Sequence, residues 1–353
     1  MDLNGGKCPE RDFKGEAASR VDSSEIRVPR IAIVGTGFVG STTAYALMMS
    51  GVSAEIVLID RDPRRAEGHV NDLRDAEVFF PTTRTFVGDF SDCCSADITI
   101  ITAGVGQAAG RSREDGMRET GAIVHGLVSD VCRSTPGGIL LIASNPVDVM
   151  THAAWKWSGL PSERVIGSGT SLDTSRFRWR LAESYGISTA NVHAYVVGEH
   201  GDSQIPVLSS ARVAGFPLDE FCTQLGLDYD ESAFARIAEE TRRAGVDIIG
   251  AKGATYFGIG AALVRIVRAI LRNEDAILTV SSCAPASLGL GEVSLSLPCI
   301  VNRTGIAKVL SVPLNSSERK ALEASAEVVK RNIAKLAASI PLRGNNGFAD
   351  EEE

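Results

Sequence analysis

One histidine of the chain lies among residues that suit proton transfer. His200 stands in the sequence Gly-Glu-His-Gly-Asp (residues 198–202), directly after the apolar run 195–197. Neighbouring carboxylates stabilise a protonated imidazole near neutral pH, and the flanking glycines predict a tight backbone path. A loop histidine without a chemical role would fit this segment equally well. The segment alone therefore leaves two interpretations open, an acid/base residue and an ordinary loop residue.

A carboxylate and a guanidinium are spaced for a single helix face upstream of this histidine. Asp173 and Arg176 are three residues apart in a segment with helical character, so they would lie side by side on a helix. Arg178 would lie about 200° around the helix from Arg176, so these two arginines cannot enter one pocket. An Asp/Arg pair of this kind is most often a surface ion pair. It gains a chemical role only if its helix face is directed at His200.

The N-terminal part of the chain contains a glycine pattern that suits phosphate binding. The apolar strand 31–34 runs into Gly-Thr-Gly-Phe-Val-Gly (35–40), residues 41–50 are typical of a helix, and a second strand, 55–59, ends at Asp60. Glycines at such a turn let the backbone approach a pyrophosphate at the helix N-terminus. Asp60 would accept hydrogen bonds from ribose hydroxyls and repel a 2′-phosphate, although Arg61, Arg64 and Arg65 weaken that discrimination. The pattern predicts a dinucleotide site that favours NAD over NADP.

Two further strands place polar residues at the same expected crevice. Residues 97–102 are followed by Ala103 and Gly104, and residues 139–144 are followed by Asn-Pro-Val-Asp (145–148). In an open parallel sheet, ligands bind at the carboxyl ends of the strands. Between these strands, residues 105–120 are rich in glycine and polar residues. We interpret them as a mobile loop that leads into a helix, a plausible lid, in which Arg111 and Arg113 are either functional cations or ordinary solvated charges.

The remaining pattern completes the expected fold. Residues 230–250 and 259–271 predict helices, 276–282 and 293–301 predict strands, and 316–339 predict a terminal helix with a capping-box-like start at Ser316. We therefore expect an α/β protein in which an N-terminal, doubly wound parallel sheet of the Rossmann type (30–167) precedes a C-terminal α+β substrate domain (168–342). Residues 1–29 are interpreted as a mobile extension and residues 343–353 as a mobile acidic tail.

The composition limits the classes of function. The chain has 353 residues, a formal net charge of −8 and 44% hydrophobic residues, which is typical of about two globular domains. The net negative charge argues against nucleic acid or an anionic membrane as a partner. The seven cysteines lack CxxC spacing, which favours reduced thiols over disulfides or a metal site, and the first 29 residues lack a secretory signal. We expect a cytoplasmic protein without a metal ion.

Taken in order, these motifs resemble those of the L-lactate/malate dehydrogenases. The matching segments cover about residues 30–342, and the likeness is strongest to bacterial NAD-dependent L-lactate dehydrogenases. They are the glycine motif 35–40, Asp60, Thr102-Ala103-Gly104, Ser144 to Asp148, Asp173-x-x-Arg176 and residues 198–202.

The resemblance implies a role for each chemical group. His200 would be the acid/base, Asp173 would hold its other ring nitrogen, and Arg176 would bind the substrate carboxylate in a bidentate fork. Arg113 would polarise the carbonyl group, and Asn145 and Thr255 would line the pocket. The NAD contacts would come from Gly35, Gly37, Phe38, Val39, Gly40, Asp60, Arg65, Thr102, Ala103, Gly104, Ser144, Asn145 and Ser168.

The resemblance also bears on the substrate. Gln107 occupies the lid position at which malate dehydrogenases have an arginine for the second carboxylate of oxaloacetate. A neutral glutamine would leave that carboxylate unpaired in a desolvated site, so pyruvate and L-lactate are the expected substrates. Residues Ala108, Ala109, Arg111 and Gly116 depart from the family's lid, which leaves larger 2-oxo acids open.

Bacterial members of the family suggest a regulatory site as well. Arg178 and His193 match the residues that bind fructose 1,6-bisphosphate at a subunit interface, and the family implies a homotetramer. The alternative is an exposed arginine and an ordinary strand histidine. For the whole chain, the alternatives are a malate or other 2-hydroxy-acid dehydrogenase, or a non-catalytic NAD-binding protein.

Overall fold

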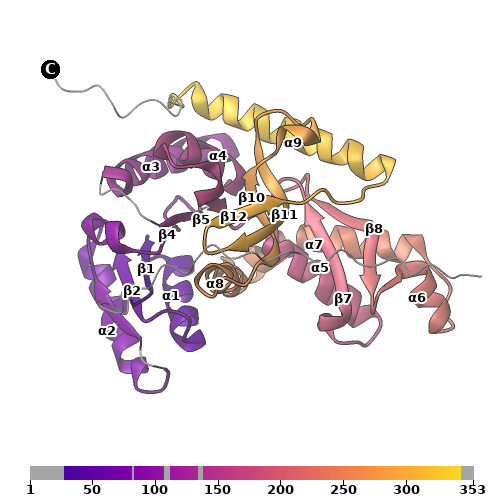
Figure 1. Cartoon of the computed structure of the whole chain (residues 1–353), viewed down its shortest axis with the longest axis horizontal. Helices are drawn as coiled ribbons and strands as arrows, with labels where there is room; N and C mark the ends of the chain where they lie inside the picture. Colours follow the sequence, from indigo (N-terminus) through magenta and orange to yellow (C-terminus); the bar gives the residue numbers. More distant parts are fainter. Residues whose placement is uncertain (1–27, 82, 107–111, 134–137, 343–353) are drawn as a thin grey trace, which may run out of the picture.

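The computed structural model describes residues 28–81, 83–106, 112–133 and 138–342 (Figure 1). Gln107 and Arg111 of the expected lid loop lie outside the described residues. So do residues 1–27 of the expected extension and the tail from residue 343.

A parallel sheet forms the centre of the N-terminal half. Its strands follow the order β3-β2-β1-β4-β5-β6, and each pairs in parallel with its neighbours. They are β1 (Arg30–Val34), β2 (Glu55–Ile59), β3 (Arg84–Val87), β4 (Ile98–Ile101), β5 (Ile139–Ile142) and β6 (Val165–Gly167). This is the doubly wound strand order of dinucleotide-binding domains. The α/β prediction with a Rossmann sheet is confirmed.

The C-terminal half extends this sheet with antiparallel strands. They are β10 (Ala276–Cys283), β11 (Ser294–Asn302) and β12 (Gly305–Val309). The junction is antiparallel, with Ser281 of β10 opposite Gly167 of β6. One continuous sheet thus crosses the expected boundary between residues 167 and 168, and strands from the expected substrate domain are built onto the sheet that carries the glycine motif.

Helices cover both faces of the sheet because the strand side chains alternate. Ile31 and Ile33 belong to one buried cluster with α1, α2 and α8, whereas Ala32 and Val34 belong to another with α3, α4 and α9. In Figure 1, α9 runs along the top of the view, from above α3 and α4 towards β8. The bounds are α1 (Phe38–Ser50), α2 (Pro63–Glu77), α3 (Arg113–Arg133), α4 (Val147–Ser158), α8 (Phe257–Leu271) and α9 (Ser316–Ala337).

A smaller antiparallel sheet and its helices form a third buried cluster around Phe177. These elements are β7 (Val192–Val197), β8 (Ile205–Val213), β9 (Phe216–Pro217), α5 (Ser171–Ser184), α6 (Leu218–Gln224) and α7 (Glu231–Lys252). Helix α5 packs against both β7 and α7, so the helix with the Asp/Arg pair lies beside the strand that leads to His200. None of the described helices is both long and apolar enough to cross a membrane.

Helix ends account for the local differences from the sequence prediction. Helix α1 begins inside the glycine motif, at Phe38 rather than Ser41. Helix α9 is capped by Asn315, whose side chain accepts a hydrogen bond from the Glu318 N–H group while the Glu318 carboxylate accepts one from the Asn315 N–H group. The capping box is therefore real, but it starts one residue before Ser316 because an asparagine also serves as N-cap.

Helix α3 continues through glycines that lower its intrinsic helix propensity. A Cβ atom at Gly121 would lie 2.5 Å from Leu336 Cδ1 of α9, and Leu336 is fully buried. The same two helices are joined at the surface by a 2.8 Å ion pair between Glu114 and Lys335. Gly121 is thus required for the close approach of α3 and α9. This packing holds α3, the helix that begins at Arg113, in place.

Replacing two glycines of α3 by alanine should have opposite effects. A methyl group added at Gly126 would meet no described atom within 4 Å, so Gly126→Ala should raise the free energy of unfolding by about 1 kcal/mol through helix propensity. Gly121→Ala should lower it by about 1 kcal/mol, because overpacking against Leu336 exceeds the propensity gain. Urea unfolding curves of both variants test this, and equal shifts would refute the packing role of Gly121.

Candidate active site

The glycine motif leaves room at the N-terminus of α1. Gly35 has a φ of +99°, and a Cβ atom at Gly40 would lie 1.9 Å from the Gly35 carbonyl oxygen, so both positions need glycine for the turn itself. Gly37 is different, because a methyl group there would meet no described atom within 4 Å. It is also the N-cap of α1 and makes no side-chain cap. Open space beside uncapped helix N–H groups fits the pyrophosphate of NAD.

The carboxylate of Asp60 is fixed at the end of β2. Its Oδ2 accepts hydrogen bonds from the Thr36 N–H group (2.7 Å) and the Thr36 hydroxyl (2.8 Å), and its Oδ1 accepts one from the Asp62 N–H group (3.0 Å). Burial alone would raise the pKa of Asp60, but these donors and nearby Arg65 outweigh it and lower the pKa. A charged carboxylate held beside the glycine turn suits ribose hydroxyls and disfavours a 2′-phosphate.

The other expected cofactor residues surround this turn. The Thr102 hydroxyl donates to the Gly35 carbonyl oxygen (2.6 Å), and the Ser144 hydroxyl donates to the Ala103 carbonyl oxygen (2.5 Å). These side chains join neighbouring strand ends, so their hydroxyls support the crevice. The ring of Phe38 is exposed and stacks on Tyr256 at 5.3 Å. The contacts of the cofactor residues with NAD remain a prediction.

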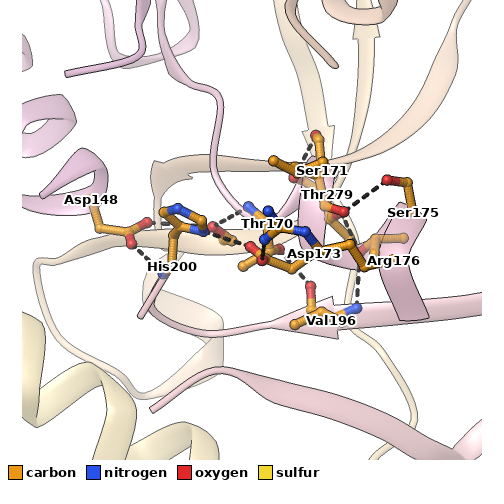
Figure 2. A network of polar contacts seen from close by, with 12 residues as sticks. Asp148, Thr170, Ser171, Asp173, Ser175, Arg176, Val196, His200 and Thr279 are labelled. Atoms are coloured by element: carbon orange, nitrogen blue, oxygen red, sulfur yellow. Dashed lines mark hydrogen bonds and ion pairs between the residues drawn. The ribbon is translucent and has the colours of Figure 1, made fainter. Parts of the chain in front are cut away.

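A buried ion network joins His200, Asp173 and Arg176 (Figure 2). Asp173 lies in the first turn of α5 with 1% of its side chain exposed. Its Oδ2 is 2.5 Å from His200 Nδ1, and its Oδ1 accepts a 2.9 Å hydrogen bond from Arg176 Nη1. The Asp173/Arg176 face is therefore directed at His200, and the surface-pair alternative does not apply.

The network sets the protonation state of His200. The charge of Asp173 raises the pKa of His200 to about 9 against the opposing effect of burial, and Asp148 adds to the rise. Burial alone would raise the pKa of Asp173, but His200 and Arg176 lower it. Since Nδ1 is bound to Asp173, Nε2 is the ring nitrogen that can exchange a proton with a ligand. The side chain of His200 is 27% exposed, which leaves it approachable.

A second carboxylate, which the sequence did not single out, holds the backbone of His200. Asp148 in the first turn of α4 accepts a 2.7 Å hydrogen bond from the His200 N–H group, and it is 2% exposed. Burial raises the pKa of Asp148 to about 6. A signal was present in the sequence, since Asp148 is a charged residue among the apolar residues Val147, Val149 and Met150 at a strand end.

Arg113 reaches the His200 loop from the N-terminus of α3. Its Nη1 forms a 2.7 Å ion pair with Asp202 Oδ2, and both side chains are 77% exposed. The hydrogen bond and charge of Asp202 raise the pKa of Arg113. The structure thus brings Arg113 to the site through Asp202, which the sequence had presented only as a neighbour of His200.

Three further candidates lie next to strand or helix ends. Asn145 is exposed after β5, Thr255 is half-buried between α7 and α8, and Ser168 is buried after β6. A methyl group at Gly245 of α7 would come within 3.9 Å of Arg176 Nη1, so α7 forms a wall beside Arg176. The described residues contain no group of three or more His, Cys, Asp or Glu side chains arranged for a metal ion.

The two types of glycine in the turn allow a test of the cofactor site. Gly37→Ala should weaken NADH binding about 10-fold or more, because its methyl group enters the space that suits a pyrophosphate, while Tm stays within about 2 °C of the parent. Gly40→Ala should lower Tm by several degrees because it collides with Gly35. NADH fluorescence titration and thermal melts separate these effects, and an unchanged NADH affinity for Gly37→Ala would contradict this placement of the cofactor.

Comparison with known proteins agrees with this geometry. Residues 29–167 match the lactate/malate dehydrogenase NAD binding domain, and residues 170–340 match the lactate/malate dehydrogenase alpha/beta C-terminal domain. The chain is 42% identical to an L-lactate dehydrogenase of Acetivibrio thermocellus and 45% identical to one of Geobacillus thermodenitrificans, in each case over 88% of this chain and 98% of the relative.

Solved structures give the same result. A lactate dehydrogenase from a Medee basin deep-sea metagenome library superimposes with a TM-score of 0.84 at 39% identity, over 88% of this chain and all of that one. The minor L-lactate dehydrogenase of Enterococcus mundtii, in its ligand-bound form, gives 0.85 at 36% identity, over 88% of this chain and 99% of that one. With both of its halves matched in this way, the chain belongs to the lactate/malate dehydrogenase family.

Proposed function

We propose that this protein is an NAD-dependent L-lactate dehydrogenase that interconverts pyruvate and L-lactate. The observation that carries the proposal is the contact of His200 with buried Asp173, because it creates an imidazole that holds a proton at neutral pH and is still approachable. The cofactor of this family is NAD, which supplies or accepts the hydride at the substrate carbon.

His200 supplies the proton that the reaction needs. In pyruvate reduction, protonated His200 donates from Nε2 to the keto oxygen, and in lactate oxidation the neutral ring accepts that proton. Asp173 fixes the ring through Nδ1 and stabilises the imidazolium in both directions. The role of Asp148 is to fix the backbone on which this ring is carried.

Arg176 is the proposed ligand of the substrate carboxylate. Its Nη1 bonds to Asp173, and its side chain is 15% exposed, so the guanidinium is already oriented before a substrate binds. A planar guanidinium can hold a carboxylate through two parallel hydrogen bonds. The same Asp173 therefore aligns the proton donor and the anion-binding group.

Arg113 is proposed to polarise the substrate carbonyl. It first has to exchange Asp202 for the substrate oxygen. An ion pair so exposed to water contributes little stability, so the exchange costs little. Inside a closed, water-poor site the same cation would stabilise developing negative charge far more strongly.

Substrate choice is assigned to Gln107, with Asn145 and Thr255 lining the pocket. A neutral side chain at position 107 is compatible with the methyl group of pyruvate. The second carboxylate of oxaloacetate would stay unpaired there, which would weaken its binding by several kcal/mol. A malate or broader 2-hydroxy-acid dehydrogenase is the alternative within the family. A non-catalytic NAD-binding protein would have no use for the His200–Asp173 pair.

A substrate panel tests this assignment. kcat/KM for pyruvate should exceed that for oxaloacetate by about 100-fold, as expected for an unpaired carboxylate, and Gln107→Arg should reverse the order by restoring a partner for it. His200→Asn is the matched control for mechanism, since it should bind NADH normally and lose about 100-fold or more in kcat. A parent enzyme that prefers oxaloacetate would disprove the role of Gln107.

We also propose that Arg178 and His193 bind fructose 1,6-bisphosphate at an interface of a homotetramer. Arg178 donates from Nε to the Ala194 carbonyl oxygen (2.9 Å), and its guanidinium lies over the Tyr195 ring at 5.5 Å. His193 is exposed on β7 beside Ala194. These contacts support the proposal because they bring a cation from α5 to the strand with an exposed imidazole. A tetramer in the cytoplasm is the expected setting.

Fructose 1,6-bisphosphate should lower KM for pyruvate about 5-fold or more and stabilise the tetramer, as expected for a coupling of ordinary size. His193→Gln should reduce this response without changing kcat at saturating pyruvate, and fructose 6-phosphate is the control because it lacks one phosphate. Steady-state kinetics and mass photometry provide the measurements. If neither KM nor the tetramer responds, Arg178 and His193 have only structural roles.

A further inference from the structure

The two partners of the acid/base pair come from separate parts of the fold. His200 follows β7, Asp173 lies 27 residues earlier on α5, and their side chains meet at 2.5 Å. A contact this short depends on how well the two backbone segments are held relative to each other. The hydroxyls of Thr170 and Thr174 provide one connection, since they bond to the Val196 carbonyl oxygen and N–H group, respectively.

Ser296 of β11 provides a second connection, first through its backbone. The Ser296 carbonyl oxygen accepts a 2.9 Å hydrogen bond from the Gly198 N–H group, and the Ser296 N–H group donates a 2.9 Å bond to the Gly198 carbonyl oxygen. This isolated antiparallel bridge lies two residues before His200. Gly198 has a φ of +89°, a conformation that favours glycine. The start of the His200 loop is thus bound to the extended central sheet.

The hydroxyl of Ser296 reaches both carboxylate-bearing helices. It accepts a 3.1 Å hydrogen bond from the N–H group of Thr170, the N-cap of α5, and it donates a 3.3 Å bond to Asp148 Oδ1 on α4. The other oxygen of Asp148 holds the His200 N–H group. Ser296 is fully buried, and a Cβ atom at Gly169 would lie 2.6 Å from its hydroxyl oxygen. Position 169 thus has no room for a side chain beside this hydroxyl, and its φ of +53° and the Ser281 nitrogen, 2.5 Å from such a Cβ, also require glycine.

We propose that Ser296 is a positioning residue for the proton-transfer pair. Its hydrogen bonds connect the loop of His200 to the helix of Asp173. On one side, Ser296 is connected through Gly198 and Asp148 to the backbone of His200. On the other side, it is connected through Thr170 to the first turn of α5. The inference rests on the proposed acid/base function of the pair. It deepens that function by naming the group that keeps the two side chains in contact.

Removing the hydrogen bonds of Ser296 should change the pKa of His200 in a definite direction. Asp173 and Arg176 from α5 and Asp148 from α4 are the charged groups that act on this imidazole. Glu199 and Asp202 belong to its own loop, and Arg113 from α3 pairs with Asp202. Asp173 is the largest contributor to the raised pKa. Because the attraction weakens with distance, a looser pair has a lower His200 pKa. Pyruvate reduction needs the protonated ring, so its loss of rate at high pH should begin at a lower pH.

The experiment uses Ser296→Ala, which removes the hydroxyl and keeps the backbone bridge to Gly198. We expect kcat for pyruvate reduction to fall about 10-fold, because the proton donor is less well aligned. NADH affinity should stay within about 2-fold, because the glycine turn is untouched. In an Asp173→Asn background, which has no charged partner left to align, the same change should lower kcat less than about 2-fold.

The pKa of His200 is read without any substrate. Diethyl pyrocarbonate acylates the neutral imidazole, so the pH dependence of acylation of the peptide that contains His200, followed by mass spectrometry, reports its pKa. Ser296→Ala should shift this titration to lower pH. Ser282→Ala is the matched control, since Ser282 is a buried serine of the adjacent strand β10 whose hydroxyl contacts Cys299. It should change neither kcat nor the titration.

The outcomes are separable. If Ser296→Ala folds poorly, Ser296→Cys is the alternative, because it keeps a side chain of similar volume with a weaker hydrogen-bonding group. It should give smaller changes of kcat and of the His200 titration in the same direction. A parent-like kcat and titration in both variants would overturn the proposal, as would an equal loss of kcat in the Asp173→Asn background. A parent protein inactive with pyruvate but with a shifted titration in Ser296→Ala would instead refute the proposed substrate and leave the positioning role standing.

Discussion

The carboxylate of Asp173 is a charge kept almost entirely out of water, and the site depends on how that charge is compensated. An isolated buried carboxylate would take up a proton rather than stay charged. Here an imidazole and a guanidinium contact its two oxygens, so the charged form is retained. Removing Asp173 would leave both cations without this partner, and removing either cation would leave the buried carboxylate with only one. The protonation of His200 and the orientation of Arg176 therefore both depend on the buried carboxylate of Asp173.

That compensation requires helix α5 and the loop after β7 to be held in a fixed relation. Within the described ranges, the fold achieves this by joining both to the central sheet instead of leaving them on a separate domain. Strand β11 belongs to the same sheet as β1, which ends at the glycine turn. The proton donor and the cofactor turn thus share one continuous hydrogen-bonded support. A displacement between the two halves would have to break β-sheet pairing as well as surface contacts.

The sequence predicted the features that rest on local patterns. The apolar runs 55–59 and 139–144 gave strands with the expected starts, because a buried parallel strand is a short, uninterrupted apolar segment. Asp173 was also expected to contact His200, as it does. That expectation came from the family motif, since nothing in the spacing of Asp173 and His200 reveals that they meet.

Features that depend on long-range packing could not be predicted in this way. Ser296 contacts the site from β11, far along the chain from His200, and a buried serine in a strand has no local signature. The Arg113–Asp202 pair likewise joins residues 89 positions apart. The glycine-rich, polar residues 105–120 suggested a loop, whereas α3 already begins at Arg113 and continues through Gly121, where α9 packs against it. Tertiary contacts here outweigh helix propensity.

The junction of β6 with β10 also has a consequence for how the chain can be divided. Ser281 pairs with Gly167 across more than a hundred residues of sequence, so this part of the sheet can close only after most of the chain has been synthesised. Residues 30–167 expressed alone would present β6 as an open edge, ready to pair with the same edge of another molecule. Contacts this distant in sequence also slow folding. The boundary between the two family domains therefore lies within one continuous sheet, and we expect a fragment that is cut there to be prone to aggregation.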